Sequence, residues 1–336
     1  MTLVTGATVT LGDLRYTVQV RSVVAELALL PGIDRVEVTI AAGVDVPATA
    51  GSSGTVELDG GDGAAVVLTG TVDLVERTTS GTVVVLGDAG AALAAVRPAE
   101  TYDGLTGTQL VSRLADLASA GTGQVAALTQ TAAYVADPGR TAAEHVAAVA
   151  LRSDAVAAVD ADGQVTVVPW PVGLPTAAMR LDREFTSFTA STHAVPHELA
   201  PVGAGGSGAA MAPDAWVHAT DPVTGADDPD GTRTWVPDPV LRTRTDTDLA
   251  ARGLTSRRAA TTARLRATCW LQPARRPGDV VRVDETDEDA QAGPWLLTSV
   301  RHDLAPGLAR TSLVGVAAGS SDDLLGGLAG AFGGLL

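Results

Sequence analysis

Two stretches of the chain carry the same succession of short apolar strands, and this repetition restricts the fold more than any other sequence feature. In both stretches apolar residues alternate with polar ones, and glycine-rich or acidic segments separate the runs, as in half-buried antiparallel strands. We therefore predict a mainly β protein with two similar small β-barrels; the alternative is a chance likeness between two hairpins. The aligned segments are 54–59, 68–76 and 81–87 in the first stretch, and 278–284, 296–304 and 309–315 in the second.

Changes in hydrophobic periodicity divide the chain into four parts. Alternating strands come first, a helical stripe then takes over, and a second set of strands follows. A segment rich in Gly, Pro and Asp predicts a long flexible loop within the second set. We expect a first β-barrel domain (1–88), an α+β insertion of two helices and a hairpin (89–175), a second β-barrel domain (176–317) with its flexible loop (200–240) and a helix (246–266), and a Gly-rich apolar tail (318–336).

The insertion carries the clearest local signals. Thr108 is predicted to cap its first helix, because hydroxyl side chains satisfy free backbone amides at helix starts. Thr141 and Glu144 have the spacing of a capping box and predict the start of the second helix. Asp162-Gly163 is a turn pair with alternating apolar residues on both sides, which predicts a hairpin.

Composition narrows the possible partners. Aromatic residues make up only 3% of the chain, so its cores must pack small and β-branched side chains, which favours strands. The formal net charge is −16 and all basic charge is arginine, so binding to nucleic acid phosphates is disfavoured.

The sequence shows no secretion signal and no apolar run long enough to span a bilayer, so we expect synthesis and assembly in the cytoplasm.

Three motifs suggest ligand binding but lack the context that such sites need. GAGGSG (203–208) matches a dinucleotide fingerprint without the flanking strand and helix. DDPDGT (227–232) resembles a calcium loop, yet the remaining ligands and the closing glutamate are missing. The acidic run DETDED (284–289) has the pattern of a solvated loop.

Other reactive residues are equally unsupported. His193 and His197 are separated by a proline that spoils a helical metal-binding pair, and no third ligand is near. The single cysteine, Cys269, is expected to be a small buried residue at a junction between helix and strand. We therefore predict no catalytic, cofactor-binding or metal-binding residues, and no enzyme activity.

The segment from about 246 to 315 resembles a known family. Its order is a helix, then RPGDVV, GPWLLTSVRHDL and GLARTSLVG. This succession resembles the closing segment of the baseplate hub family of contractile tails, which includes the phage late control protein D and the hub half of the valine-glycine repeat spike protein of type VI secretion.

The resemblance implies a structural role. Members of the family form trimeric adaptors that join a hexameric tail tube to a trimeric spike. For this chain it implies a homotrimer in a phage baseplate or a phage-tail-like particle, with tail tube protein, spike protein and other baseplate proteins as partners. The spike is expected to be a separate protein.

Two residue sets are candidates for these contacts. Arginines on the expected helix are predicted to bridge subunits, because guanidinium groups bind carboxylates in bidentate fashion. Apolar residues of the tail are predicted to dock on the spike or inside the ring, because leaving them in water is unfavourable. The first set is Arg257, Arg258, Arg264 and Arg266, and the second is Leu324, Leu325, Leu328, Phe332, Leu335 and Leu336.

Three alternative functions remain open from the sequence. The chain could be a tail-associated peptidoglycan hydrolase, which would need two well-placed carboxylates among its many acids. It could be the hub of a long non-contractile phage tail with a related barrel fold. It could also be a free carbohydrate-binding β protein.

Overall fold

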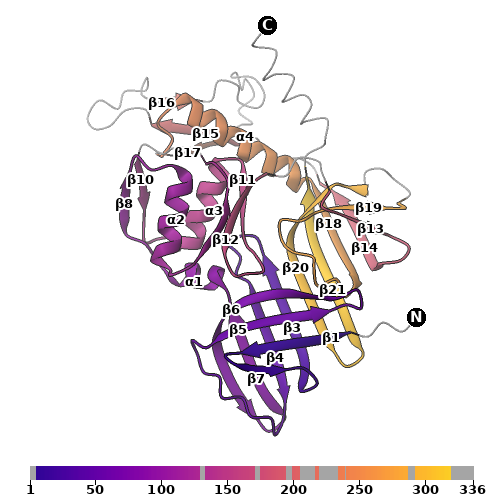
Figure 1. Ribbon diagram of the computed structural model, residues 1–336. Coiled ribbons are helices and arrows are strands. Elements are labelled where there is room, and N and C mark those ends of the chain that lie inside the picture. The colour runs from indigo at the N-terminus through magenta and orange to yellow at the C-terminus, as the bar shows by residue number, and fades with distance from the viewer. Residues whose placement is uncertain are drawn as a thin grey trace.

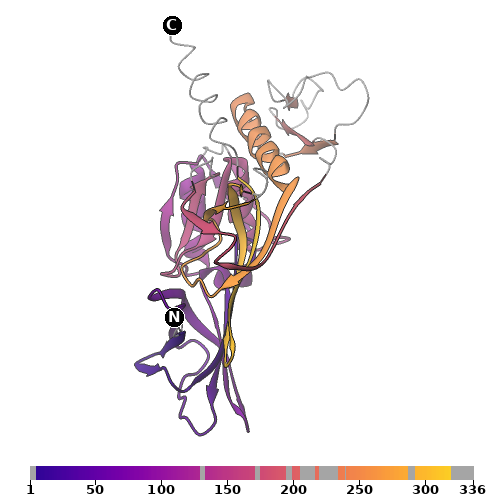
Figure 2. The same cartoon turned by 90° about the vertical axis from the view of Figure 1, so that its right-hand side faces the viewer.

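The computed structural model describes residues 5–128, 133–170, 175–193, 199–204, 216–218, 234–238, 240–286 and 292–318. These residues form a first β unit (6–87), an insertion (89–169) and a second β unit (177–192 and 263–317). A long helix, α4 (Arg244–Thr261), runs across the far end of the insertion toward the second β unit (Figure 1). Figure 2 shows the same molecule from the side, with the first β unit at one end and α4 at the other.

Seven strands of the first β unit curl around one apolar core. Side chains alternate between buried and exposed along its strands, as the period of a half-buried strand requires. Val38, Ile40 and Val56 are fully buried in this core. The strands are β1 (Gly6–Leu11), β2 (Leu14–Tyr16), β3 (Val20–Ala28), β4 (Arg35–Ala41), β5 (Ser53–Asp59), β6 (Ala64–Thr78) and β7 (Gly81–Gly87).

The described residues of the insertion (89–128 and 133–169) form three helices where the sequence predicted two. The capping box of Thr141 and Glu144 is confirmed, and so is the hairpin at Asp162-Gly163. The first predicted cap was wrong: Thr106 caps the helix, while the Thr108 hydroxyl donates to the carbonyl oxygen of Ala126 at 2.8 Å. The helices are α1 (Ala89–Ala95), α2 (Gly107–Leu117) and α3 (Ala142–Arg152), and the strands are β8 (Glu100–Asp103), β9 (Thr122–Val125), β10 (Ala133–Ala136), β11 (Ala155–Val159) and β12 (Val165–Pro169).

The second β unit has its own core. Trp295, Leu265 and Cys269 are buried there with neighbouring aliphatic side chains. Its strands are β13 (Ala177–Arg180), β14 (Phe185–Thr192), β18 (Ala263–Trp270), β19 (Val280–Asp284), β20 (Trp295–Ala305) and β21 (Leu308–Ala317). Three further strands occur where the sequence predicted a flexible loop, and they pair as one small sheet. They are β15 (Leu199–Ala204), β16 (Trp216–His218) and β17 (Thr234–Pro237). Residues 205–215 and 219–233 are outside the described part.

The predicted helix over 246–266 is too long at its C-terminal end. Helix α4 ends at Thr261, and β18 begins at Ala263. Leu265, Ala267 and Cys269 are buried, whereas Arg264, Arg266 and Trp270 are exposed, so the residues alternate with the period of a strand. Consecutive β-branched threonines at 261 and 262 also disfavour continuation of the helix.

The two β units share a single sheet of 13 strands. Its main path runs β14-β18-β21-β20-β3-β4-β7-β6-β5-β1-β2, with β19 and β13 attached at β20. The two units meet where β20 pairs with β3, in a ladder from Ser299–Ala28 to Leu304–Val23. The mainly β fold is thus confirmed. Closure of each half into a barrel stays a prediction, because among the described strands β14 and β2 are the two ends of the path.

The sequence repeat corresponds to two similar meanders. The first is β5-β6-β7 and the second is β19-β20-β21, each with consecutive antiparallel pairing. Each meander therefore contributes the same succession of strands to a different half of the sheet. Of the described helices, none is long and apolar enough to cross a membrane.

Candidate interaction face and buried junction

One face of β18 carries exposed side chains that the core does not use. Arg264, Arg266 and Trp270 point away from the core, and Trp270 is 52% exposed. Arg266 pairs across the ladder with Val314 of β21, which is 41% exposed. Directly opposed residues of an antiparallel ladder lie on the same face of a sheet. These four residues form an exposed patch on the second β unit, here called the β18 face.

Arginines beside the β18 face are already neutralised within the chain. Arg301 forms ion pairs with Glu26 and Asp303. Arg310 reaches the other oxygen of Asp303, with Nε to Oδ2 at 3.0 Å. In the described part of the chain, Arg264 and Arg266 make no such pair. Their charge is therefore open to an acidic partner surface.

Arg257 and Arg258, the other two arginines of the predicted interface, lie on α4 and are partly buried. Arg257 Nη2 donates to the carbonyl oxygen of Ala155 at 3.0 Å, and its guanidinium lies 5.7 Å from the centre of the Trp170 ring. Burial lowers the pKa of Arg257 from its ordinary value. Arg257 thus ties α4 to the insertion inside one chain, and the structure does not bring it onto the β18 face.

A buried polar cluster lies where the three parts of the molecule meet, and the sequence did not reveal it. Asp34 follows β3 and is 2% exposed; Asp88 caps α1 and is 6% exposed. One oxygen of Asp34 accepts the Ala28 N–H at 2.7 Å, and one oxygen of Asp88 accepts the Gly90 N–H at 2.8 Å. Burial and then the charge of Asp88 raise the pKa of Asp34 well above its usual value, and burial raises the pKa of Asp88 to about 6.

Arg276 enters this cluster from the second β unit. Its Nη1 donates to the carbonyl oxygen of Val66 on β6 at 3.1 Å. Burial lowers the pKa of Arg276, whereas the negative charges of Asp34, Asp160 and Asp88 raise it. Asp160 belongs to the β11–β12 turn, so one cation is held between acids of the first β unit and the insertion. We call Asp34, Asp88 and Arg276 the junction cluster.

The junction cluster has paired carboxyls but not the access that polysaccharide hydrolysis requires. A glycosidase places its two carboxyl groups on either side of the bond to be cleaved. Asp34 and Asp88 are almost fully buried, so a cell-wall polymer does not reach them in this conformation. The cluster is therefore a structural contact between the three parts.

The remaining motifs do not assemble into a site among the described residues. Cys269 is buried, as predicted, but it lies inside β18 and not at a junction between helix and strand; burial raises its pKa to about 12. His193 contacts Ser191, and His197 lies outside the described part. No group of three or more potential metal ligands occurs in the described ranges. Also outside are 205–208, 227–232 and the predicted docking residues Leu324, Leu325, Leu328, Phe332, Leu335 and Leu336.

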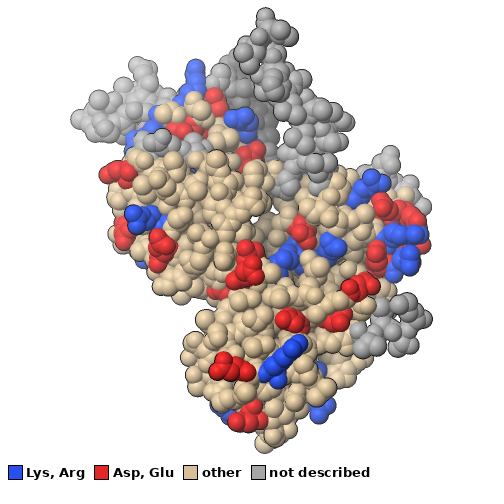
Figure 3. Space-filling view, viewed as in Figure 1, with Lys and Arg blue, Asp and Glu red and all other residues tan. Residues whose placement is uncertain are grey.

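Charge on the visible surface is mixed. In Figure 3, acidic and basic side chains intermingle over the face shown, and no single basic area dominates it. Such a surface offers no continuous track for a phosphate backbone on that side.

Comparison with solved structures shows which proteins share this fold. A 43 kDa tail protein of prophage MuSo2 from Shewanella oneidensis matches with a TM-score of 0.66 and 14% identity, covering 94% of this chain and 99% of that one. A tail protein from Neisseria meningitidis MC58 matches with a TM-score of 0.67 and 15% identity, covering 93% and 96%.

A third neighbour comes from a secretion system. The Escherichia coli c3393 protein, a type VI secretion component described as similar to the T4 tail proteins gp27 and gp5, has a TM-score of 0.63 and 14% identity over 92% of this chain and 76% of that one. No model of a known protein family matches the sequence, and no curated protein sequence matches it. The chain therefore has the mainly β fold shared by phage tail proteins and by spike-related components of type VI secretion.

Proposed function

We propose that this protein is a baseplate hub: a structural component of a phage tail, or of a phage-tail-like injection particle, that joins the tail tube to the spike. The observation that carries the proposal is the fold likeness to tail proteins over more than nine-tenths of the chain. Because the likeness extends over the insertion as well as both β units, it concerns the whole arrangement and not one common β motif.

Internal repetition supports a trimer as the working form. Each chain contributes two similar meanders, so three chains would present six of them to a hexameric tube. The insertion occurs once per chain and would leave only three-fold symmetry toward a trimeric spike. Closed rotational symmetry also prevents open-ended polymerisation.

The β18 face is the proposed contact between subunits. It combines an exposed aromatic side chain with arginines that form no ion pair with another described residue, and aromatic residues and arginine are both enriched at protein interfaces. A net charge of −16 per chain provides acidic groups with which Arg264 and Arg266 can pair on a neighbouring copy.

The proposal is tested by imaging assembled tails purified through an affinity tag on this chain. Density with three copies between tube and spike is expected. Density with six copies, or with one, would refute the adaptor role. The double variant Arg264→Glu/Arg266→Glu should prevent incorporation, whereas the matched change Arg15→Glu on exposed β2 should not.

Two other functions are separated by simple observations. A hub of a long non-contractile tail would purify without sheath protein, and the fold likeness to prophage tail proteins keeps it as the second candidate. A tail-associated peptidoglycan hydrolase would release soluble fragments from purified cell wall. We expect no release, because the paired carboxyls of the junction cluster are buried.

A further inference from the structure

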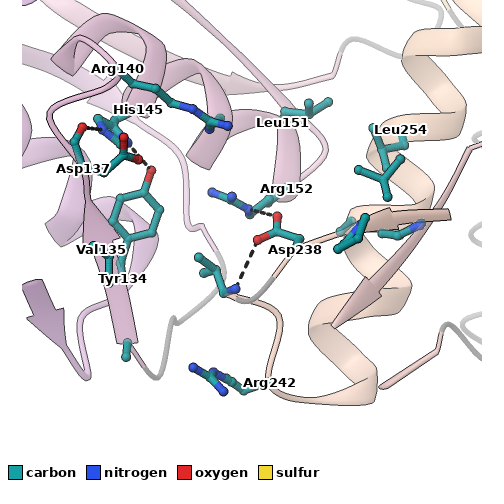
Figure 4. A pocket seen from close by; sticks show the side chains of 17 residues that line it. Tyr134, Val135, Asp137, Arg140, His145, Leu151, Arg152, Asp238, Arg242 and Leu254 are labelled. Atoms are coloured by element: carbon teal, nitrogen blue, oxygen red, sulfur yellow. Dashed lines mark hydrogen bonds and ion pairs between the residues drawn. The ribbon is translucent and has the colours of Figure 1, made fainter. Parts of the chain in front are cut away.

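A cavity of about 440 Å³ lies between the insertion and α4. Its walls come from β10, α3, β15, β17 and the middle of α4, and ten of its 17 lining residues are alanine, valine, leucine or proline. Figure 4 shows Val135, Leu151 and Leu254 on its walls. The volume falls within the range of about 300–1,000 Å³ that is typical of ligand sites in proteins.

The cavity is bordered by the edges of two strands. Ala133, Tyr134 and Val135 all line it, although consecutive residues of a strand point to opposite faces. A cavity lined by three consecutive residues therefore lies along the edge of β10. Among the described strands β10 pairs only with β8, and β17, on the opposite wall, pairs only with β15. Unpaired strand edges present backbone donors and acceptors that an added strand can use.

Arg152 supplies a positive charge in the wall between these edges. Its Nε donates to Asp238 at 2.6 Å, which joins α3 to the segment before α4. The other Asp238 oxygen accepts the Val240 N–H at 3.1 Å, so both oxygens of this carboxylate are engaged. Arg152 Nη1 is buried and has no hydrogen-bond partner among the described residues. Nη1 itself is closed to a ligand, but the Arg152 side chain as a whole is 17% exposed and lines the cavity, so its positive charge attracts an anionic group there.

The other polar groups of the wall are occupied or basic. His145 Nε2 lies 3.0 Å from the Asp137 carbonyl oxygen, which can only accept, so His145 Nδ1 accepts the Tyr134 hydroxyl proton at 2.8 Å. Arg140 and Arg242 lie on either side of Arg152 in Figure 4. The lining therefore holds three arginines against two aspartates, and it favours a ligand that carries negative charge.

We propose that this cavity binds an extended segment of a partner protein, which adds as a strand to the edge of β10 and places one acidic side chain against Arg152 between aliphatic neighbours. β10 is the preferred edge because it contains no proline, whereas Pro237 of β17 has no backbone N–H to donate. The site goes beyond the proposed adaptor role, since it lies on the insertion and away from the β18 face.

Binding is measured by fluorescence anisotropy with the full chain and a set of end-capped heptapeptides. The peptides alternate Val, Ile, Leu or Thr and carry Glu or Gln at the centre. We expect Glu-centred members to bind with a Kd below about 1 mM and about 10-fold more tightly than their Gln-centred counterparts. Methylation of alternate backbone nitrogens in the best peptide should abolish binding, because it blocks pairing with a strand edge.

Substitutions in the lining test whether the preference for Glu-centred peptides arises in the cavity. Arg152→Gln combined with Asp238→Asn removes both charges of the ion pair without leaving either one unpaired, and it should remove the preference for Glu. Arg140 is exposed, so Arg140→Gln should leave the fold intact, and it should weaken binding several-fold because it removes one positive charge of the lining. Arg15→Gln, on the distant β2, is the matched control. Circular dichroism and thermal melting verify that each variant is folded.

Three results would contradict the proposed site. Equal binding of Glu- and Gln-centred peptides, or no binding by any peptide at about 1 mM, would overturn the proposal. Tight binding that survives backbone methylation would also overturn it, because the ligand would then not add as a strand. None of these results depends on tail assembly, so failure here leaves the adaptor role standing, and failure of that role leaves this site standing.

Discussion

The buried carboxyl groups of Asp34 and Asp88 interact inside the junction cluster, where the charge of Asp88 adds to burial in raising the pKa of Asp34. Burial raises the pKa of both groups, to about 6 for Asp88 and well above the ordinary value for Asp34. The first β unit and the insertion therefore meet at a carboxyl pair whose environment favours a bound proton, with Arg276 of the second β unit beside it.

This arrangement predicts stability that decreases as pH rises. In the unfolded chain both aspartates ionise near pH 4, whereas in the folded protein burial raises the pKa of Asp88 to about 6 and the pKa of Asp34 well above its ordinary value. Between these values the folded state binds more protons, so the free energy of unfolding falls as pH rises through this window. Urea unfolding between about pH 4.5 and 7.5 should show this decrease.

Asp34→Asn should flatten that dependence. The amide of Asn keeps a hydrogen-bond donor toward Asp88 but does not titrate. At about pH 7.5 the free energy of unfolding of the variant should therefore be higher than that of the original protein by roughly 1–2 kcal/mol. The exposed Asp13→Asn serves as the control and should leave the curve unchanged. An equally steep decrease in Asp34→Asn would show that the proton resides elsewhere.

Arg276 should be coupled energetically to Asp88. Arg276→Met removes a half-buried cation and leaves the Asp88 charge without its neighbour, so we expect a loss of about 2–3 kcal/mol in the free energy of unfolding. In the double variant with Asp88→Asn the loss should be smaller than the sum of the single losses by at least about 1 kcal/mol. Strict additivity in urea unfolding would contradict a shared cluster.

Gly163 should be intolerant of a side chain because of a contact between parts of the molecule. Its φ is +76°, and an added Cβ would meet the carbonyl oxygen of Thr69 on β6. Gly12 also has a positive φ, of +56°, but open space around it. Gly163→Ala should therefore lower the free energy of unfolding by about 1–3 kcal/mol more than Gly12→Ala does. Equal losses would mean that the hairpin turn and β6 separate readily.

Cys269 should be chemically inert in the folded protein. It is fully buried, its thiol lies 3.5 Å from the carbonyl oxygen of Thr311, and burial raises its pKa to about 12. A thiol reagent at pH 8 should react only after urea unfolds the chain, since the thiolate is the reactive form. The chain has one cysteine, so the absorbance change reports this position alone. Rapid reaction of native protein would indicate that β18 opens.

Local patterns predicted the elements that are stabilised locally. The capping box at Thr141 and Glu144 and the turn at Asp162-Gly163 depend on neighbouring residues, so a short window of sequence contains all of their information. The end of α4 was misplaced because Ala263 and Leu265 continue the helical spacing while also fitting the alternation of β18. Packing of Leu265 into the second core decides between the two.

The junction cluster and the cavity could not be predicted because their residues come from distant segments. Asp34, Asp88 and Arg276 each lie in a loop or at a helix start, where polar residues are common. One signal was present: Asp88 is the only charged residue in the apolar run 82–96. Arg152 and Asp238 meet only because α4 turns back over α3, and no local pattern encodes that approach.

The ladder between β3 and β20 also has a consequence for synthesis. β3 is complete when residue 28 has left the ribosome. The edge of β3 that pairs with β20, however, stays unpaired until residue 304 has also been synthesised. Throughout that interval a nascent chain exposes the backbone of an apolar strand, which is the kind of edge that recruits other chains. A truncated chain that lacks β20 would leave this edge of β3 unpaired. Premature termination should therefore yield insoluble fragments, and only full-length chains would assemble.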